Sequence, residues 1–144
     1  MKKIGNNLIE GFDSYTWPDG SKFEGELKEG KMNGKGTHTW PDGTKYFGEF
    51  KNHKMAGHGI LTVPSGIEYS GEWKNGKKNG KGTYTINGRI EYQGEWKNEK
   101  YHGTGIFMAP DGRRYEGEFK ENELWNGIEY DKEGKKIRTV HLGV

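Results

Sequence analysis

Residues 69–89 read YSGEWKNGKKNGKGTYTINGR, and residues 92–113 repeat them closely as YQGEWKNEKYHGTGIFMAPDGR. Glycine pairs spaced Gly-x-Gly recur every 23 residues, beginning at positions 34, 57, 80 and 103. Self-similarity at one constant spacing is typical of a repeat architecture, in which each unit is a single supersecondary element. An aromatic residue followed by x-Gly-Glu keeps the same step, at Phe23, Tyr46, Tyr69, Tyr92 and Tyr115.

The composition favours a thin, extended structure over a thick core. Hydrophobic residues make up 29% of the chain and charged residues 31%, yet aromatic residues reach 13%. Disordered chains are poor in aromatics, so the apolar surface here is carried by rings and is sufficient for folding. The net charge of only +2 argues against a nucleic-acid partner, because phosphate binding needs clustered Lys and Arg. Without cysteine, neither a disulfide nor a thiolate metal site can form.

Within each repeat the hydrophobic pattern has a period of two, which predicts strands. Tyr69, Gly71 and Trp73 point to one face, and the following NGKKNG supplies turn residues before a returning strand. Each repeat is therefore expected to be a β-hairpin. The whole chain is predicted to be an all-β antiparallel meander of about eleven or twelve short strands.

The glycines are expected to lie opposite aromatic rings, which would cover the bare backbone and restore lost contacts. Each cross-strand pair contributes only about 0.2–1 kcal/mol, so stability would come from many neighbouring repeats. The register assumed for this arrangement aligns Lys74 with Lys81 across the hairpin and Trp40 with Tyr46 across the Pro-Asp-Gly turn. It places Trp73 opposite Gly82, Tyr84 opposite Gly71, His38 opposite Gly48 and Phe50 opposite Gly36.

The repeats divide one domain, residues 1–144, into units. We expect a half repeat at about 11–22, full repeats at 23–45, 46–68, 69–91 and 92–114, and a divergent C-terminal repeat or cap at 115–144. In that cap, Ile137 is expected to take the position that aromatic residues hold elsewhere.

The pattern Y-x-G-E-W-K-N-G-K-x-x-G-x-G-x-x-x-x-x-D-G resembles the MORN (membrane occupation and recognition nexus) repeat family over about residues 11–134. The resemblance implies an elongated, twisted, single-layer antiparallel sheet of tandem 23-residue hairpins with a shallow groove. The chain departs from the pattern at a few positions, which suggest a cap at the C-terminal end. They are Leu27 and Phe50 at the Trp position, Glu99 at the turn glycine, and residues 126–128 where Gly-x-Gly is due.

Nothing in the sequence predicts catalysis, a metal or a cofactor. The segment GKKNGKGT has one residue too few for a phosphate-binding loop and leads into a strand, not a helix. No two histidines have metal-site spacing, so we assign the histidines structural or solvated roles. The regularly spaced Glu and Lys residues are interpreted as a solvated, edge-protecting face: Glu26, Glu49, Glu72, Glu95 and Glu118, with Lys28, Lys51, Lys74, Lys97 and Lys120.

Three functions remain as hypotheses, and the first is a non-catalytic scaffold that binds a protein or peptide along the aromatic, glycine-lined groove. Trp and Tyr are over-represented among binding hot spots. The alternative use for these rings is to cover the glycines. The residues predicted to bind the partner are Tyr46, Phe50, Tyr69, Trp73, Tyr84, Tyr92, Trp96 and Phe107.

The second hypothesis is attachment to an anionic membrane surface through Lys77, Lys78 and Lys81, weakened by interleaved glutamates. The third is end-to-end self-association through edge strands, unless residues 4–9 cover the N-terminal edge; otherwise the chain is a monomer. The opening MKKIGNNLIEG lacks an apolar run, and no stretch approaches the about 20 apolar residues of a membrane span. We therefore expect a cytoplasmic protein that contacts a membrane only peripherally.

Overall fold

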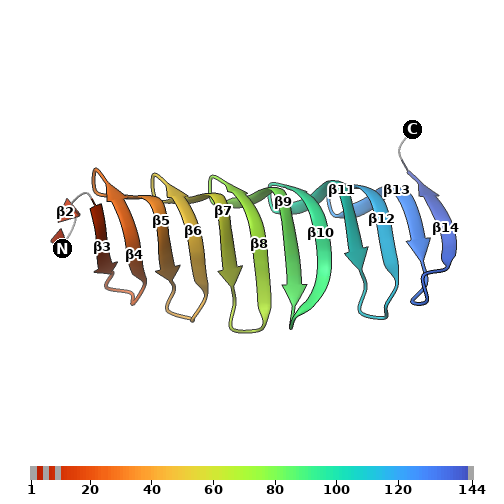
Figure 1. Ribbon diagram of the computed structural model, residues 1–144, viewed down its shortest axis with the longest axis horizontal. Helices are drawn as coiled ribbons and strands as arrows, with labels where there is room; N and C mark the ends of the chain where they lie inside the picture. Colours follow the sequence, from red (N-terminus) through yellow and green to blue (C-terminus); the bar gives the residue numbers. More distant parts are fainter. Residues whose placement is uncertain (1–2, 5–6, 9–10, 143–144) are drawn as a thin grey trace.

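The computed structural model describes residues 3–4, 7–8 and 11–142. A 12-stranded antiparallel sheet holds strands β3 to β14 in chain order, and a separate two-stranded pair joins β1 to β2. Figure 1 shows the twelve strands side by side along one axis, with β3 and β14 at opposite ends. The predicted all-β meander of tandem hairpins is confirmed. The strands are β1 (Lys3–Ile4), β2 (Asn7–Leu8), β3 (Gly11–Thr16), β4 (Lys22–Lys28), β5 (Lys31–Thr39), β6 (Lys45–Lys51), β7 (Lys54–Thr62), β8 (Ile67–Lys74), β9 (Lys77–Ile86), β10 (Arg89–Lys97), β11 (Lys100–Met108), β12 (Arg114–Lys120), β13 (Glu123–Tyr130) and β14 (Lys136–His141).

The turn inside each repeat is shorter than the sequence suggested. Lys74 pairs with Lys77, not with Lys81, so only Asn75 and Gly76 form the turn. Their φ angles of 51° and 80° are those of a two-residue turn whose twist matches the flanking strands. The assumed register was therefore wrong by several residues near the turn.

A bulge then changes the register in the middle of the hairpin. Gly71 and Trp73 are two residues apart in β8, whereas their partners in β9, Gly82 and Lys78, are four residues apart. The extra residues lie at the Gly-x-Gly motif, since glycine tolerates the bent backbone that a bulge requires. As a result Gly71 faces Gly82 and Tyr69 faces Tyr84, in place of the predicted pairs between rings and glycines.

The turn between repeats explains the second register error. Trp40 donates its backbone N–H to the Thr44 carbonyl at 2.8 Å and so belongs to the turn itself. His38, not Trp40, therefore pairs with Tyr46. Glycine again faces glycine here, Gly36 against Gly48, and Phe50 pairs with Gly34, not Gly36.

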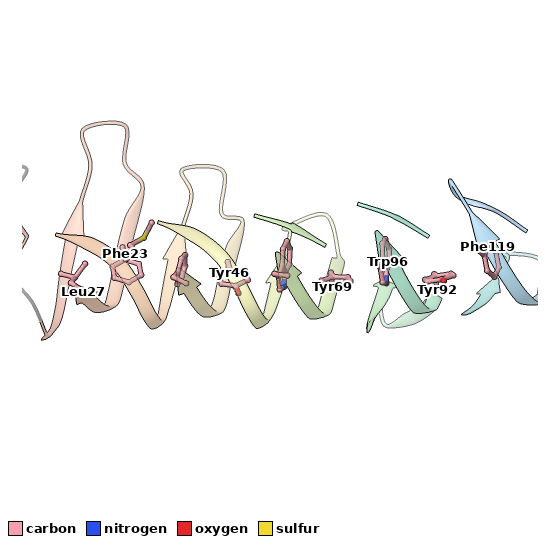
Figure 2. Close-up of a cluster of buried hydrophobic side chains, with 10 residues drawn as sticks. Phe23, Leu27, Tyr46, Tyr69, Tyr92, Trp96 and Phe119 are labelled. Atoms are coloured by element: carbon pink, nitrogen blue, oxygen red, sulfur yellow. The ribbon is translucent and has the colours of Figure 1, made fainter. Parts of the chain in front are cut away.

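The core is a row of rings along one face of the sheet, which we call the core face (Figure 2). Rings do cover glycines, as expected, but diagonally: Tyr46, Tyr69 and Tyr92 each lie over a pair of facing glycines. A side chain on Gly82, for example, would collide with the Tyr69 ring and hydroxyl. Neighbouring rings meet edge to face, with centroid distances of 5.1 Å for Tyr69–Trp73 and 5.2 Å for Tyr69–Trp96. The buried hydrophobic residues are Phe23, Leu27, Met32, Tyr46, Phe50, Tyr69, Trp73, Tyr92, Trp96 and Phe119.

Two hydrogen bonds stabilise the bulge between β8 and β9. The Tyr69 hydroxyl donates to the Glu72 carbonyl at 3.0 Å, and the Glu72 carboxylate accepts the Lys81 backbone N–H at 3.2 Å. The tyrosine–carbonyl bond recurs from Tyr46 and Tyr92, and the carboxylate–amide bond recurs from Glu26 and Glu49. The interpretation of the glutamates as merely a solvated face is thus corrected for three of them.

The C-terminal repeat ends the row with charge instead of a ring. Arg138 pairs with Glu129 in the last hairpin, as Tyr69 pairs with Leu61 in an earlier repeat. Arg138, not Ile137, therefore takes the position that aromatic residues hold elsewhere. Ile137 is 46% exposed, whereas Glu129 is only 3% exposed. Arg138 Nε donates to the Glu129 carboxylate at 2.6 Å, and this bond holds the pKa of Glu129 below its usual value. The row therefore closes on an ion pair.

Candidate interaction surface

A second row of partly buried apolar side chains lies on the core face, packed against the buried rings. We call it the outer row, and it differs from the core in keeping part of each side chain in contact with solvent. Its members come from successive repeats, so it extends along the sheet. They are Trp17, Trp40, Met55, Leu61, Tyr84, Tyr101, Phe107, Tyr115 and Leu124.

Polar groups are built into the outer row at its centre. Tyr101 stacks on the buried Tyr92, with centroids 3.9 Å apart and planes 4° apart, and donates its hydroxyl to Glu91 at 3.0 Å. Burial raises the pKa of Tyr84, and the charge of Glu91 adds to this effect. The surface is therefore apolar with a few placed hydrogen-bonding groups, as recognition sites generally are.

The residues predicted to bind a partner fall into two groups. Tyr84 and Phe107 lie in the outer row and keep exposed surface. The other six form the buried core, where they cover glycines and one another: Tyr46, Phe50, Tyr69, Trp73, Tyr92 and Trp96. Sequence reasoning missed most of the outer row, although Met55, Tyr101 and Leu124 share one position of the 23-residue period.

Lys78 occupies that same position in its own repeat and points into the core face. Its side chain is only 15% exposed, so little of it is available to a membrane surface. Its Nζ lies 2.9 Å from Glu99 Oε1, and its backbone N–H donates to Glu99 Oε2 at 2.8 Å. Glu99, which stands where the pattern has a turn glycine, thus links two repeats through these bonds to Lys78. The carboxylate reaches back from a turn residue with φ 75°.

The other lysines of the proposed lipid-binding group are separated from Lys78. Lys77 lines a depression of about 620 Å³ between two successive hairpin turns, together with Lys74, Lys97 and His102. Lys81 lines a different depression, of about 450 Å³, over Gly82 and Gly94. The three predicted lysines therefore lie in three environments, and the depression at Lys77 is also lined by Lys74, Lys97 and Glu95.

The opposite face of the sheet carries a smaller apolar patch. Phe47 is 58% exposed and Ile60 is 38% exposed, and the two pair across β6 and β7 beside a depression of about 320 Å³. This patch is short compared with the outer row, which recurs along the sheet.

His38 lies near the N-terminal end of the row, between two indoles. Its ring centroid is 5.3 Å from that of Trp17 and 4.4 Å from that of Trp40. Burial lowers its pKa, while the charge of Asp19 opposes that shift. In the 23-residue pattern His38 stands where Tyr84 and Phe107 stand, so a neutral ring is the form that suits this position.

Within residues 3–4, 7–8 and 11–142, His, Asp and Glu form no group of three that could hold a metal ion. The same part of the chain contains no helix long and apolar enough to cross a bilayer.

An open single-layer sheet of tandem hairpins, with apolar side chains recurring on one face, defines a repeat scaffold domain. The MORN repeat family model matches residues 6–22, 23–45, 46–67, 69–88, 92–113 and 115–125, which is most of the chain. The chain therefore belongs to the MORN repeat family. A search of curated proteins gave no match.

Proposed function

We propose that this protein is a non-catalytic scaffold that captures a segment of a partner protein along the outer row. The observation that carries the proposal is the row itself: partly buried apolar side chains recur along the core face of a sheet held by its own buried rings. A rigid surface binds with a smaller loss of conformational entropy than a flexible one.

The centre of the row is the favoured contact. Tyr84, Tyr101 and Phe107 bring three rings together, with centroids of Tyr101 and Phe107 5.9 Å apart. Aromatic side chains of this kind dominate binding free energies, and losing one typically costs about 2–4 kcal/mol at a hot spot. The buried rings beneath act mainly through support, because they are only 0–5% exposed as long as the side chains packed against them stay in place.

The test is a selection of peptides from a displayed library against the wild-type protein, followed by affinity measurements on substituted proteins. We expect Tyr84→Ala/Phe107→Ala to weaken the selected peptides at least about thirtyfold, the equivalent of about 2 kcal/mol. The matched control, Phe47→Ala/Ile60→Ala, removes apolar side chains from the opposite face and should leave affinity unchanged. Equal loss in both variants, or loss only in the control, would contradict this use of the core face.

A second function, attachment to an anionic membrane surface, is favoured by the depression between the hairpin turns. Lys74, Lys77 and Lys97 border it, and each basic residue near an anionic leaflet contributes about 1 kcal/mol. Flotation with phosphatidylserine vesicles should then fall when these three lysines are changed to glutamate. A triple variant that floats like the wild type rules out this lysine site.

A further inference from the structure

Four aromatic rings surround one nitrogen atom, the Nζ of Lys78. The ring centroids lie 5.5 Å away for Tyr69, 5.7 Å for Trp96, 5.8 Å for Tyr84 and 6.0 Å for Trp73. A cation within about 6 Å of a ring centre is attracted by the electrons of the ring face. Glu99 adds a full negative charge at 2.9 Å. Together these groups form a cation site, and the protein's own lysine occupies it.

The fold does not require a cation at this position. The residues at the same place in the other repeats are Met32, Met55, Tyr101 and Leu124, all apolar. The turn residue that reaches back is likewise acidic only here; at the matching positions stand His53, Gly76 and Asn122. The lysine, the acid and the rings therefore coincide in the central repeat alone.

The spacing of the rings suits a larger cation than a primary ammonium. At 5.5–6.0 Å the bare nitrogen of Lys78 leaves space before each ring. An N–C bond is about 1.5 Å long, so a methyl group on such a nitrogen would reach about 4 Å from the ring centres, which is van der Waals contact. A trimethylammonium group also has no N–H donors to leave unsatisfied in an aromatic site.

We propose that Tyr69, Trp73, Tyr84, Trp96 and Glu99 form a recognition site for a trimethylammonium group, carried by a trimethylated lysine of the partner segment. Lys78 occupies the site until that group displaces it. This inference rests on the proposed function, because Tyr84 belongs to both the outer row and the site. The resident lysine lowers the apparent affinity in proportion to the time it spends over the rings.

The first experiment titrates tetramethylammonium chloride into the wild-type protein and Lys78→Ala. The indole resonances of Trp73 and Trp96 report binding, and sodium chloride at equal ionic strength serves as the blank. We expect saturable shifts in both proteins and an affinity at least about fivefold higher in Lys78→Ala, where the occupant is gone.

Two matched variants locate the site. Met55→Ala opens the same register position in the preceding repeat, where Gly76 replaces the acid, and it should leave the affinity at the wild-type level. Glu99→Gln keeps an oxygen for the Lys78 backbone N–H but removes the charge, and it should weaken tetramethylammonium binding in the Lys78→Ala background. An equal gain in Met55→Ala would overturn the proposal.

Absence of saturable shifts in folded Lys78→Ala, judged by circular dichroism, also overturns it. If that variant does not fold, Lys78→Met takes its place, since methionine is the natural residue at positions 32 and 55. Methionine should fill the site and abolish the wild-type response to tetramethylammonium. A response that persists in Lys78→Met contradicts binding over these rings.

The last arm uses a lysine peptide in trimethylated and unmethylated forms, and vesicles of phosphatidylcholine. Preferential binding of the trimethylated peptide supports the proposal, whereas binding to the vesicles alone overturns the peptide source. The outcome is separable from that of the scaffold hypothesis. Tetramethylammonium binding without any library-selected peptide contradicts only the scaffold, and selected peptides without any cation response contradict only the cation site.

Discussion

Replacing Gly82 by alanine tests how the rings and glycines hold this sheet together. A Cβ on Gly82 would collide with Tyr69. Its three nearest neighbours would be the Tyr69 hydroxyl oxygen and two ring carbons, all within 2.5 Å. Tyr69 is fully buried, so its ring cannot move away without losing packing contacts. Its displacement would also break the hydroxyl bond to the Glu72 carbonyl, 3.0 Å long.

Three contributions set the expected magnitude. Overpacking costs about 1–3 kcal/mol, and an unsatisfied buried carbonyl costs about 1–3 kcal/mol more. Replacing glycine restricts the unfolded chain and offsets about 0.4–1 kcal/mol. We therefore expect Gly82→Ala to lower the free energy of unfolding by about 1–5 kcal/mol, measured by urea denaturation with tryptophan fluorescence and circular dichroism together.

A double-mutant cycle separates the clash from other effects. In a Tyr69→Ala background the added methyl group has room, so Gly82→Ala should cost at least about 1 kcal/mol less there. Lys81→Ala, one residue away and exposed, should change stability by less than about 0.5 kcal/mol. Additive effects in the cycle, or a Gly82→Ala variant as stable as the wild type, would refute the packing of this ring over glycine.

The remaining predictions concern protons and the bulge. Burial lowers the pKa of His38 in the folded state, so the unfolded state takes up a proton first as the pH falls below about 6.5. The free energy of unfolding should therefore decrease from that pH until the pH passes the folded-state pKa. His38→Phe should reduce this decrease in urea melts. Burial, reinforced by the charge of Glu95, raises the pKa of Tyr92, so stability should fall above about pH 10, where only the unfolded state releases that proton; a smaller fall in Tyr92→Phe would confirm it. Glu72→Ala removes the acceptor of the Lys81 N–H and should cost about 1 kcal/mol, whereas Lys74→Ala on the same strand should cost nothing measurable in the same assay.

The repeat and its strands could be predicted from the sequence because they depend on local periodicity. The 23-residue step and the alternation around Tyr69, Gly71 and Trp73 already specify a hairpin per repeat. The register could not be predicted in the same way. The sequence around NGKKNG is compatible with turns of different length and with or without a bulge at Gly-x-Gly. Each of these choices shifts the cross-strand pairing of every residue that follows.

The candidate site was predicted only in part for a related reason. The sequence shows which residues share a face, and Tyr84 and Phe107 were correctly placed on the aromatic one. It does not show which rings of that face lie beneath the others, because burial depends on how neighbouring repeats pack. Lys78 illustrates this most clearly: its place over four rings depends on residues of two repeats, from Tyr69 to Glu99.

By itself, then, the sequence determined the tandem hairpins, their order and the positions of the recurring glycines, since all of these follow from spacing along the chain. The tertiary structure alone decided that glycine faces glycine and that the largest rings form the core. It also decided that the outer row and Lys78 pack against the core rings and stay partly exposed. The physical reason is that side-chain accessibility results from contacts between repeats, and residues 21 positions apart, such as Lys78 and Glu99, become neighbours only when the sheet is assembled.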